Sequence, residues 1–144
     1  MPSRVVLDTN VLVAAIRSDG GASRVLLVDA LEANFTLVAS VPLMIEYEAV
    51  LTRQEHLEPS GLTSEDVQSV LDAIAAIVEP VRLAYLWRPM LSDVADEMVL
   101  ETAVNGRADL LVTLNVRHFE SATESFAVRL ASPAEALALL GKRS

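Results

Sequence analysis

Short apolar runs alternate with longer segments of helical periodicity over the whole chain. The first run, residues 5–7, leads directly into Asp8, Thr9 and Asn10. A short apolar run bounded by polar residues is typical of a strand that is buried on both faces. On this pattern, strands are predicted at residues 5–7, 35–41, 81–83, 110–114 and 126–130.

Helices are predicted between these strands. Apolar residues at helical spacing indicate helices over residues 11–16, 22–31, 42–53, 64–79, 93–104 and 133–141. Thr63 and Ser132 stand at the N-cap positions of two of these helices. Residues 54–61 are predicted to be a polar connection, and residues 85–91 a loop or extended segment.

The alternation of strands and helices predicts one α/β domain over residues 1–144, with a mainly parallel central sheet. Hydrophobic residues make up 52% of the chain and charged residues 22%, which is enough apolar surface for a sizeable core. The sequence contains no cysteine, so disulfides and cysteine-type zinc sites are excluded. Without a signal peptide or a membrane-spanning run, a cytoplasmic protein is expected.

The net charge of −9 narrows the choice of partners. It argues against broad binding of a phosphate backbone, which needs clustered Lys and Arg. It permits a metal-dependent site, because divalent cations offset local acidic charge. It also suits a basic protein partner.

Four oxygen-bearing side chains follow predicted strands or open predicted helices. Asp8 and Asn115 follow strands directly, Glu46 lies in the helix after the second strand, and Asp96 lies in the first turn of a later helix. The carboxyl ends of parallel strands share one edge of the sheet, and the helices that follow them start there. Glu46 reaches that edge if its helix starts near Pro42, whereas Asp96 needs a helix start that returns to it. Together they would form an oxygen-rich site suited to Mg²⁺ or Mn²⁺.

Each candidate also has a simpler structural explanation. Asp8 could cap the helix that follows, Glu46 could lie with Glu48 on a solvated helix face, and Asn115 could be a turn residue. Asp93 is most simply an N-cap, which makes Asp96 an acid that the helix dipole favours.

Other polar residues carry weaker signals. Thr9, Asn10 and Thr113 could be ordinary strand-end groups. Helix acids are usually exposed, which is the expectation for Glu97 and Glu101. His56 and His118 are the two histidines of the chain; His56 lies in a predicted polar loop and is expected to be exposed, and the pair makes a weak case for zinc.

Four segments in this order resemble a PIN-domain ribonuclease, most of all the VapC-like toxins. Residues 6–12 (VLDTNVL) match the opening acid motif, and Glu46 matches the acid of the helix after strand two. Residues 93–103 resemble the Asp-Pro-Asp-Asp-Glu segment, whose later Asp is the third site acid. Residues 108–115 (ADLLVTLN) resemble the ending Ala-Asp-apolar-apolar-Val-Thr-x-Asp/Asn.

The resemblance implies a three-layer α/β/α sandwich, a Mg²⁺ or Mn²⁺ cofactor and hydrolysis of RNA phosphodiester bonds. It also implies frequent homodimers and an antitoxin partner. Two positions depart from the pattern: Asn115 stands where many members have Asp, and His118 stands where some relatives have another Asp.

These observations lead to a metal-dependent endoribonuclease as the first hypothesis. Metal ligands would be Asp8, Glu46 and Asp96, and Asn115 would orient a ligand or the attacking water. Substrate-facing or supporting groups would be Thr9, Asn10, Thr113 and Arg117. The alternative is a PIN-fold binding protein with weak or no nuclease activity. A phosphatase with Asp8 as nucleophile is less favoured, because Asn10 stands where a second Asp is usual and the single Lys is Lys142.

Overall fold

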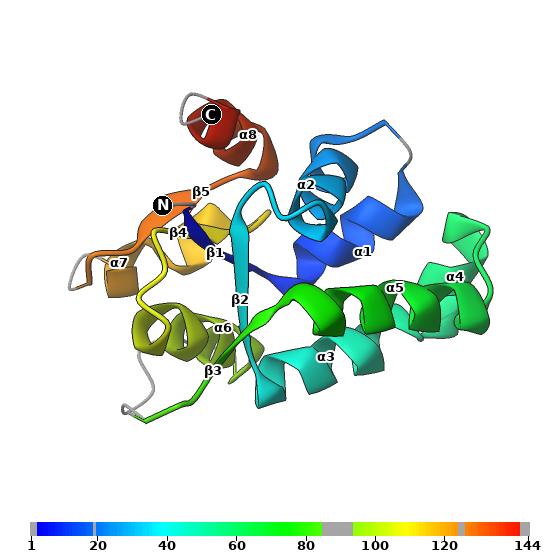
Figure 1. The fold of residues 1–144 in the computed structure, drawn as a ribbon, viewed down its shortest axis with the longest axis horizontal. Helices are drawn as coiled ribbons and strands as arrows, with labels where there is room; N and C mark the ends of the chain where they lie inside the picture. Colours follow the sequence, from blue (N-terminus) through cyan, green and yellow to red (C-terminus); the bar gives the residue numbers. More distant parts are fainter. Residues whose placement is uncertain (1–2, 19, 85–93, 124–125, 142–144) are drawn as a thin grey trace.

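The structure is a computed structural model, and it describes residues 3–18, 20–84, 94–123 and 126–141 (Figure 1). Its elements in chain order are β1 (Arg4–Leu7), α1 (Thr9–Arg17), α2 (Ala22–Leu31), β2 (Thr36–Ser40), α3 (Val41–Leu51), α4 (Gln54–Ser60), α5 (Ser64–Ile77), β3 (Glu79–Val81), α6 (Val94–Asn105), β4 (Leu110–Val112), the 3₁₀ helix η1 (Val116–His118), α7 (Glu120–Thr123), β5 (Arg129–Ala131) and α8 (Pro133–Gly141).

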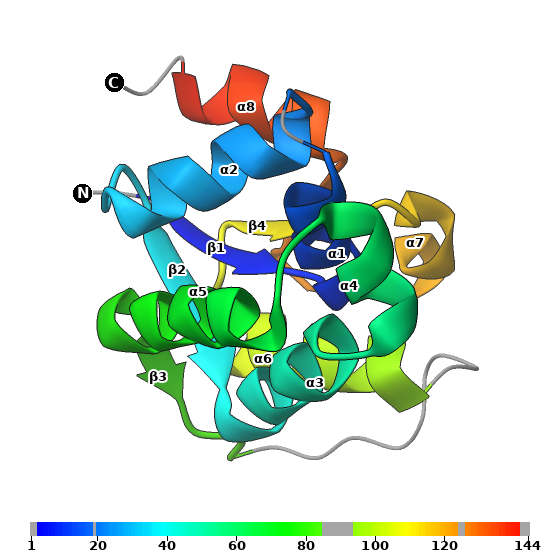
Figure 2. The ribbon, with the colours of Figure 1, turned by 90° about the vertical axis from the view of Figure 1, so that its right-hand side faces the viewer.

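A five-stranded sheet with the order β3-β2-β1-β4-β5 forms the centre of the molecule, and every strand pairing in it is parallel. Helices cover both faces. Helices α2 and α8 pack on each other on one face, and α6 packs against β1, β2 and β4 on the other (Figures 1 and 2). The predicted α/β/α architecture with a mainly parallel sheet is therefore confirmed.

The central strand β1 and its neighbour β4 contribute completely buried residues to the core. Val5, Val6 and Leu7 are completely buried, as are Leu111 and Val112. Parallel strands covered by helices on both faces are expected to be apolar throughout, which is the pattern that the sequence shows here. The edge strand β3 contains Pro80, whose missing N–H is tolerated at an edge.

Local capping chemistry sets two helix starts where the sequence predicts them. The Thr63 N–H donates to Asp66 Oδ2 at 2.9 Å, and the Asp66 N–H donates to Thr63 Oγ1 at 3.1 Å. Ser132 and Glu135 make the same reciprocal pair at the start of α8. These hydrogen bonds favour the ionised carboxylates and lower the pKa of both Asp66 and Glu135.

Several predicted boundaries were wrong. Residues 54–60 form helix α4, not a polar connection, because α4 packs against α1 and buries Leu57 while its other faces stay polar. Gly61, in the left-handed conformation with φ 72°, ends it. Strand β3 begins two residues earlier than predicted and β5 three residues later, and β4 ends at Val112, so that Thr113 lies just beyond it. Helices η1 and α7 were not predicted.

Two predictions, the loop over residues 85–91 and the cap at Asp93, lie outside the described residues. Of the helices that the structure describes, none combines the length and the apolar character needed to cross a lipid bilayer.

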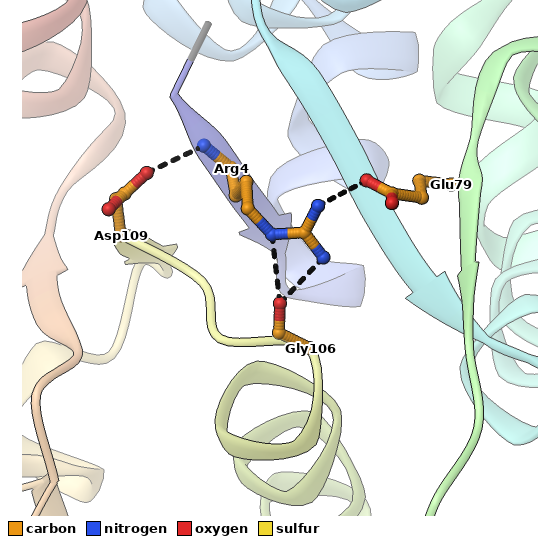
Figure 3. Close-up of polar contacts among 4 residues, drawn as sticks. All are labelled: Arg4, Glu79, Gly106 and Asp109. Carbon is orange, nitrogen blue, oxygen red and sulfur yellow. Dashed lines mark hydrogen bonds and ion pairs between the residues drawn. The ribbon is translucent and has the colours of Figure 1, made fainter. Parts of the chain in front are cut away.

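Arg4 holds together the edge of the sheet at which the strands begin (Figure 3). Its Nε and Nη2 donate to the Gly106 carbonyl oxygen at 2.9 and 2.7 Å, and Nη1 pairs with the carboxylate of Glu79. Its backbone N–H donates to Asp109 Oδ2 at 2.8 Å. One residue thus connects β1, β3 and the α6–β4 turn, and it places the end of α6 at this amino edge.

Gly106 allows this turn to pack closely. A Cβ at Gly106 would lie 2.8 Å from Val38 Cγ1, 2.8 Å from Val81 Cγ2 and 2.9 Å from the Thr102 carbonyl oxygen. We expect Gly106→Ala to lower the free energy of unfolding by about 1–3 kcal/mol, because stiff valines and backbone must move apart. Urea denaturation of the purified protein measures this change.

Gly20→Ala is the matched control, because a Cβ there meets nothing within 4 Å. Its free energy of unfolding should stay within about 0.5 kcal/mol of the wild type. Equal losses for the two variants would contradict the packing explanation.

Candidate active site

Asp8 lies at the end of β1, at the N-cap position of α1, and is 7% exposed. Its side chain makes no capping hydrogen bond. Instead, Oδ2 accepts a hydrogen bond of 2.8 Å from Thr113 Oγ1 at the end of β4. The side chain is therefore bonded to the neighbouring strand end, while the N–H groups of Thr9 and Asn10 at the start of its own helix lie near enough to favour its charge.

Thr113 connects Asp8 with the rest of this edge. Its completely buried hydroxyl oxygen also accepts the N–H of Asn115 at 3.0 Å and the Nδ2 of Asn10 at 3.4 Å. Asn10 Oδ1 in turn accepts the N–H of Leu114 at 3.3 Å. The predicted supporting residues Asn10 and Thr113 are thus brought together with Asp8.

The carboxylate of Asp8 is unfavourable as an isolated anion. Burial is the largest cause that raises its pKa, and the nearby charge of Asp96 raises it further. The Thr113 hydroxyl and the N–H groups of Thr9 and Asn10 lower the pKa, without cancelling the effect of burial. No Lys or Arg within the described chain pairs with Asp8, so a bound cation would relieve this cost.

Asp96 reaches the same edge because α6 runs back along the sheet. Arg4 holds the end of α6 at the amino edge, so that its first turn lies at the carboxyl edge, near Asp8. The Asp96 side chain is 15% exposed, and its Oδ2 lies 3.3 Å from His118 Nδ1. Asp96 could reach this edge only if its helix started there, and the structure places the start of α6 at the carboxyl edge.

Glu46 is positioned by its neighbour in α3. The Tyr47 hydroxyl, completely buried, donates to the Leu7 carbonyl oxygen at 2.5 Å. Burial, and then the charge of Asp8, raise the pKa of Tyr47, so that it remains a neutral donor. Helix α3 therefore lies against the end of β1, with Glu46 half-buried on it, although Glu46 makes no hydrogen bond or ion pair in the described part of the chain.

The structure brings only some of the predicted site residues together. Asp8, Asn10 and Thr113 form one hydrogen-bonded group, and Asp96 lies close enough to affect Asp8. The side chains of Asn115 and Arg117 are exposed, and the buried hydroxyl of Thr9 has no hydrogen-bond partner among the described residues. Across the same residues, no three His, Asp or Glu side chains form a ready-made metal cluster.

This donor set nevertheless fits an open divalent site. Mg²⁺ is commonly bound by one or two carboxylates together with water and substrate phosphates. Asp8 and Asp96 supply two carboxylates, and the buried anion of Asp8 supplies the reason to bind a cation. Mg²⁺ or Mn²⁺ therefore fits the residues that are present.

Two other expectations were wrong. Glu97, expected to be exposed, is buried, with only 9% of its surface exposed. Burial, and then the charge of Glu97, raise the pKa of the half-buried Glu101. Glu97 lies three residues before the buried Leu100 on the same helix, and this spacing was the signal that could have shown that Glu97 is buried. His56, expected to be exposed, lies on α4 with a side chain that is only 16% exposed.

Two surface depressions lie near this edge of the sheet, and neither Asp8 nor Asp96 lines them. A hollow of about 360 Å³ is lined by residues 114–118, beside the Asp96–His118 contact. The apolar groove of about 390 Å³ between α3, α5 and β3 is lined by neither Asp8 nor Asp96, and its walls lack the chemistry of this site.

A model of the PIN domain family matches residues 4–117. The chain belongs to the PIN domain family. The match includes Asp8, Glu46, Asp96 and Asn115 and ends just before His118. PIN domains are generally nucleases that use divalent metals, which agrees with the acid pair at the sheet edge.

The fold of this PIN domain is similar to that of a solved structure. One chain of VapBC2 from Rickettsia felis, in a crystal structure with a DNA fragment from their promoter, matches with a TM-score of 0.60 and 18% identity. The match covers 90% of this PIN domain and 98% of that chain. Among curated proteins there is no match.

We expect Thr113→Val to lower the free energy of unfolding by about 1–3 kcal/mol, because Asp8, Asn10 and the Asn115 amide all lose a buried partner. Chemical denaturation with and without EDTA measures the loss. Thr36→Val is the control: this half-buried β2 residue makes no side-chain hydrogen bond in the described chain. A similar loss in both variants would show that Thr113 matters only for packing.

We expect metal-free Asp8→Asn to be more stable than the wild type near neutral pH, with no difference in acid. A raised pKa means that folded Asp8 keeps its proton where the unfolded chain has lost it. The protonated Asp8 carboxyl therefore makes its full contribution to the free energy of unfolding below the ordinary pKa of 3.8, and this contribution is lost as the pH rises through the folded pKa. Asn resembles the protonated carboxyl and avoids this loss.

Urea denaturation in EDTA across this pH range tests the expectation. Asp72→Asn, an exposed carboxylate on α5, is the control for a general effect of net charge. A stability difference between Asp8→Asn and wild type that does not change with pH would refute the assignment.

Proposed function

We propose that this PIN domain is a metal-dependent endoribonuclease, and that it is the toxin of a toxin–antitoxin pair. The observation that carries the proposal is the buried carboxylate of Asp8, which lies beside Asp96 at the carboxyl edge and has no basic partner in the described chain. A site of this kind gains from a divalent cation and from a substrate that completes the coordination.

Each residue then has a defined task. Asp8 and Asp96 hold Mg²⁺ or Mn²⁺, and Glu46 approaches from α3, directly or through water. When bound, such a cation lowers the pKa of water and neutralises negative charge on a phosphodiester. Thr113 keeps Asp8 in place by its hydrogen bond of 2.8 Å. Asn115, exposed at the rim, orients the attacking water.

RNA approaches across the open hollow beside Asn115 and His118. Arg117 is exposed there and can contact a phosphate, while Asn10 and Thr9 support the start of α1. The net charge of −9 gives the protein little general affinity for a polyanion. Attraction at the site must therefore come mostly from the bound cation, so substrate binding should depend strongly on metal.

The antitoxin partner rests on the similarity to a chain of VapBC2, which was solved with promoter DNA. A basic antitoxin segment would complement the acidic surface of this chain. A homodimer belongs to the same proposal, since the motifs that resemble PIN-domain toxins imply one.

The decisive experiment is cleavage of RNA with and without Mn²⁺. We expect Asp8→Asn and Asp96→Asn to lose activity by at least about 10–100-fold, because each removes a charge from the metal site. Glu46→Gln should lose activity in the same direction. Glu48→Gln, on the exposed face of the same helix, is the matched control and should keep wild-type activity.

Equal cleavage by wild type and Asp8→Asn would reject this site. A second function, a PIN-fold binding protein without nuclease activity, is favoured by the lack of a ready three-acid cluster among the described residues. Calorimetry separates the two functions. A folded protein that binds no Mn²⁺ at millimolar metal would support the binding protein.

A further inference from the structure

We infer that the buried hydroxyl pair of Ser40 and Thr102 fixes helix α3 against helix α6 and thereby sets the approach of Glu46 to the metal. Ser40 is 1% exposed and Thr102 is completely buried, so both act through the helices that carry them and are positioning residues. The inference rests on the proposed function, because it concerns the placement of one acid of that site.

A directed chain of hydrogen bonds joins the two helices. Thr102 Oγ1 donates to the Met98 carbonyl oxygen, one turn earlier in α6, at 2.9 Å. Because its single proton is then used, Ser40 Oγ is the donor in the contact of 2.7 Å between the two hydroxyls. Ser40 Oγ in turn accepts the N–H of Leu43, in the first turn of α3, at 3.3 Å. The cap of α3 is therefore bonded to the interior of α6.

Burial makes this hydroxyl pair specific. Separating α3 from α6 would leave a buried hydroxyl without its partner, and an unmade hydrogen bond in the interior costs more than a made one contributes. Apolar contacts between the same helices have no preferred direction. The hydroxyl pair therefore specifies the relative position of the two helices more closely than their apolar packing does.

The two helices carry acids at equal spacing from this contact. Glu46 lies six residues after Ser40 in α3, and Asp96 lies six residues before Thr102 in α6. Six residues of helix span about 9 Å. A helix is stiff over this length, so a shift at the hydroxyl pair moves Glu46 relative to Asp96.

A second buried hydrogen bond holds α3 next to Glu46. The Tyr47 hydroxyl donates to the Leu7 carbonyl oxygen, just before Asp8, at 2.5 Å. Helix α3 is thus held at its start by α6 and at Tyr47 by β1 (Figure 2). With the second contact alone, α3 could pivot about the end of β1; the two together fix the direction from which Glu46 approaches.

The simpler explanation is that the hydroxyl pair only stabilises the fold. A buried hydrogen bond contributes to stability wherever it lies, and its loss need not move Glu46. The two explanations differ in the Mn²⁺ affinity of the folded protein. Only a positioning role makes that affinity depend on Thr102, and only while position 46 carries its carboxylate.

Calorimetry of Mn²⁺ binding to the whole chain tests the inference. Thr102→Val removes the hydroxyl at nearly constant shape, and we expect it to lower the Mn²⁺ affinity about 2–30-fold in a protein that circular dichroism shows to be folded. Thr102→Ser keeps the hydroxyl and should keep the wild-type affinity. Thr52→Val is the matched control, because Thr52 Oγ1 donates to the Glu48 carbonyl oxygen of its own helix at 2.7 Å. Its Mn²⁺ affinity should also stay at the wild-type value.

A thermodynamic cycle with Glu46→Gln shows whether the pair acts through Glu46. In the Glu46→Gln background, Thr102→Val should lower the Mn²⁺ affinity further by less than about twofold. Fully additive losses would overturn the inference. Wild-type affinity in folded Thr102→Val, or in Glu46→Gln alone, would do the same.

Ser40→Ala tests the pair from the other helix, and it decides the matter if Thr102→Val does not fold. It removes a helix cap together with the hydroxyl, so Thr63→Ala, at the cap of α5, is its control. A lower Mn²⁺ affinity in Ser40→Ala than in Thr63→Ala supports the inference, and equal affinities overturn it.

The outcomes separate the inference from the proposed function. Mn²⁺ binding that needs Asp8 but is unchanged by substitutions at Ser40 and Thr102 overturns the positioning role and leaves the nuclease site intact. A folded wild type that binds no Mn²⁺ overturns both.

Discussion

The burial of one carboxylate, Asp8, constrains the carboxyl edge of the sheet. The residue follows three completely buried side chains of β1, and its own exposure is 7%. An anion in such surroundings is costly unless other groups compensate. Thr113 supplies one hydrogen bond, and the start of α1 supplies amide groups. The charge of Asp96 works in the opposite direction and raises the pKa of Asp8 further, so the cost of burying the Asp8 anion is only partly compensated.

The two edges of the sheet deal with acidic groups in different ways. At the amino edge, Arg4 pairs with Glu79, while its backbone N–H binds Asp109 (Figure 3). At the carboxyl edge, Asp8 has no Lys or Arg partner within the described residues. The same strand therefore begins at an ion pair and ends at a carboxylate that no Lys or Arg of the described residues pairs with. This contrast is the physical basis for placing function at one edge.

The departures from the family pattern change the expected chemistry without removing it. With Asn115 neutral and exposed, the fourth position contributes no charge. His118 reaches Asp96 from the following turn, and the ring nitrogen is a donor of a different kind. This PIN domain thus keeps the neighbouring carboxylates of Asp8 and Asp96 and places an imidazole beside Asp96.

The sequence by itself determined the features that depend on neighbours along the chain. The apolar runs of β1 and β4, the capping pair of Thr63 and Asp66, and the position of Asp8 at a strand end all follow from local patterns. Only the tertiary structure decided which distant groups meet. The burial of Glu97 and the contact of His118 with Asp96 depend on how α6 packs back across the sheet. Helix periodicity is read from nearby residues, whereas such contacts join segments that have no fixed spacing in the sequence.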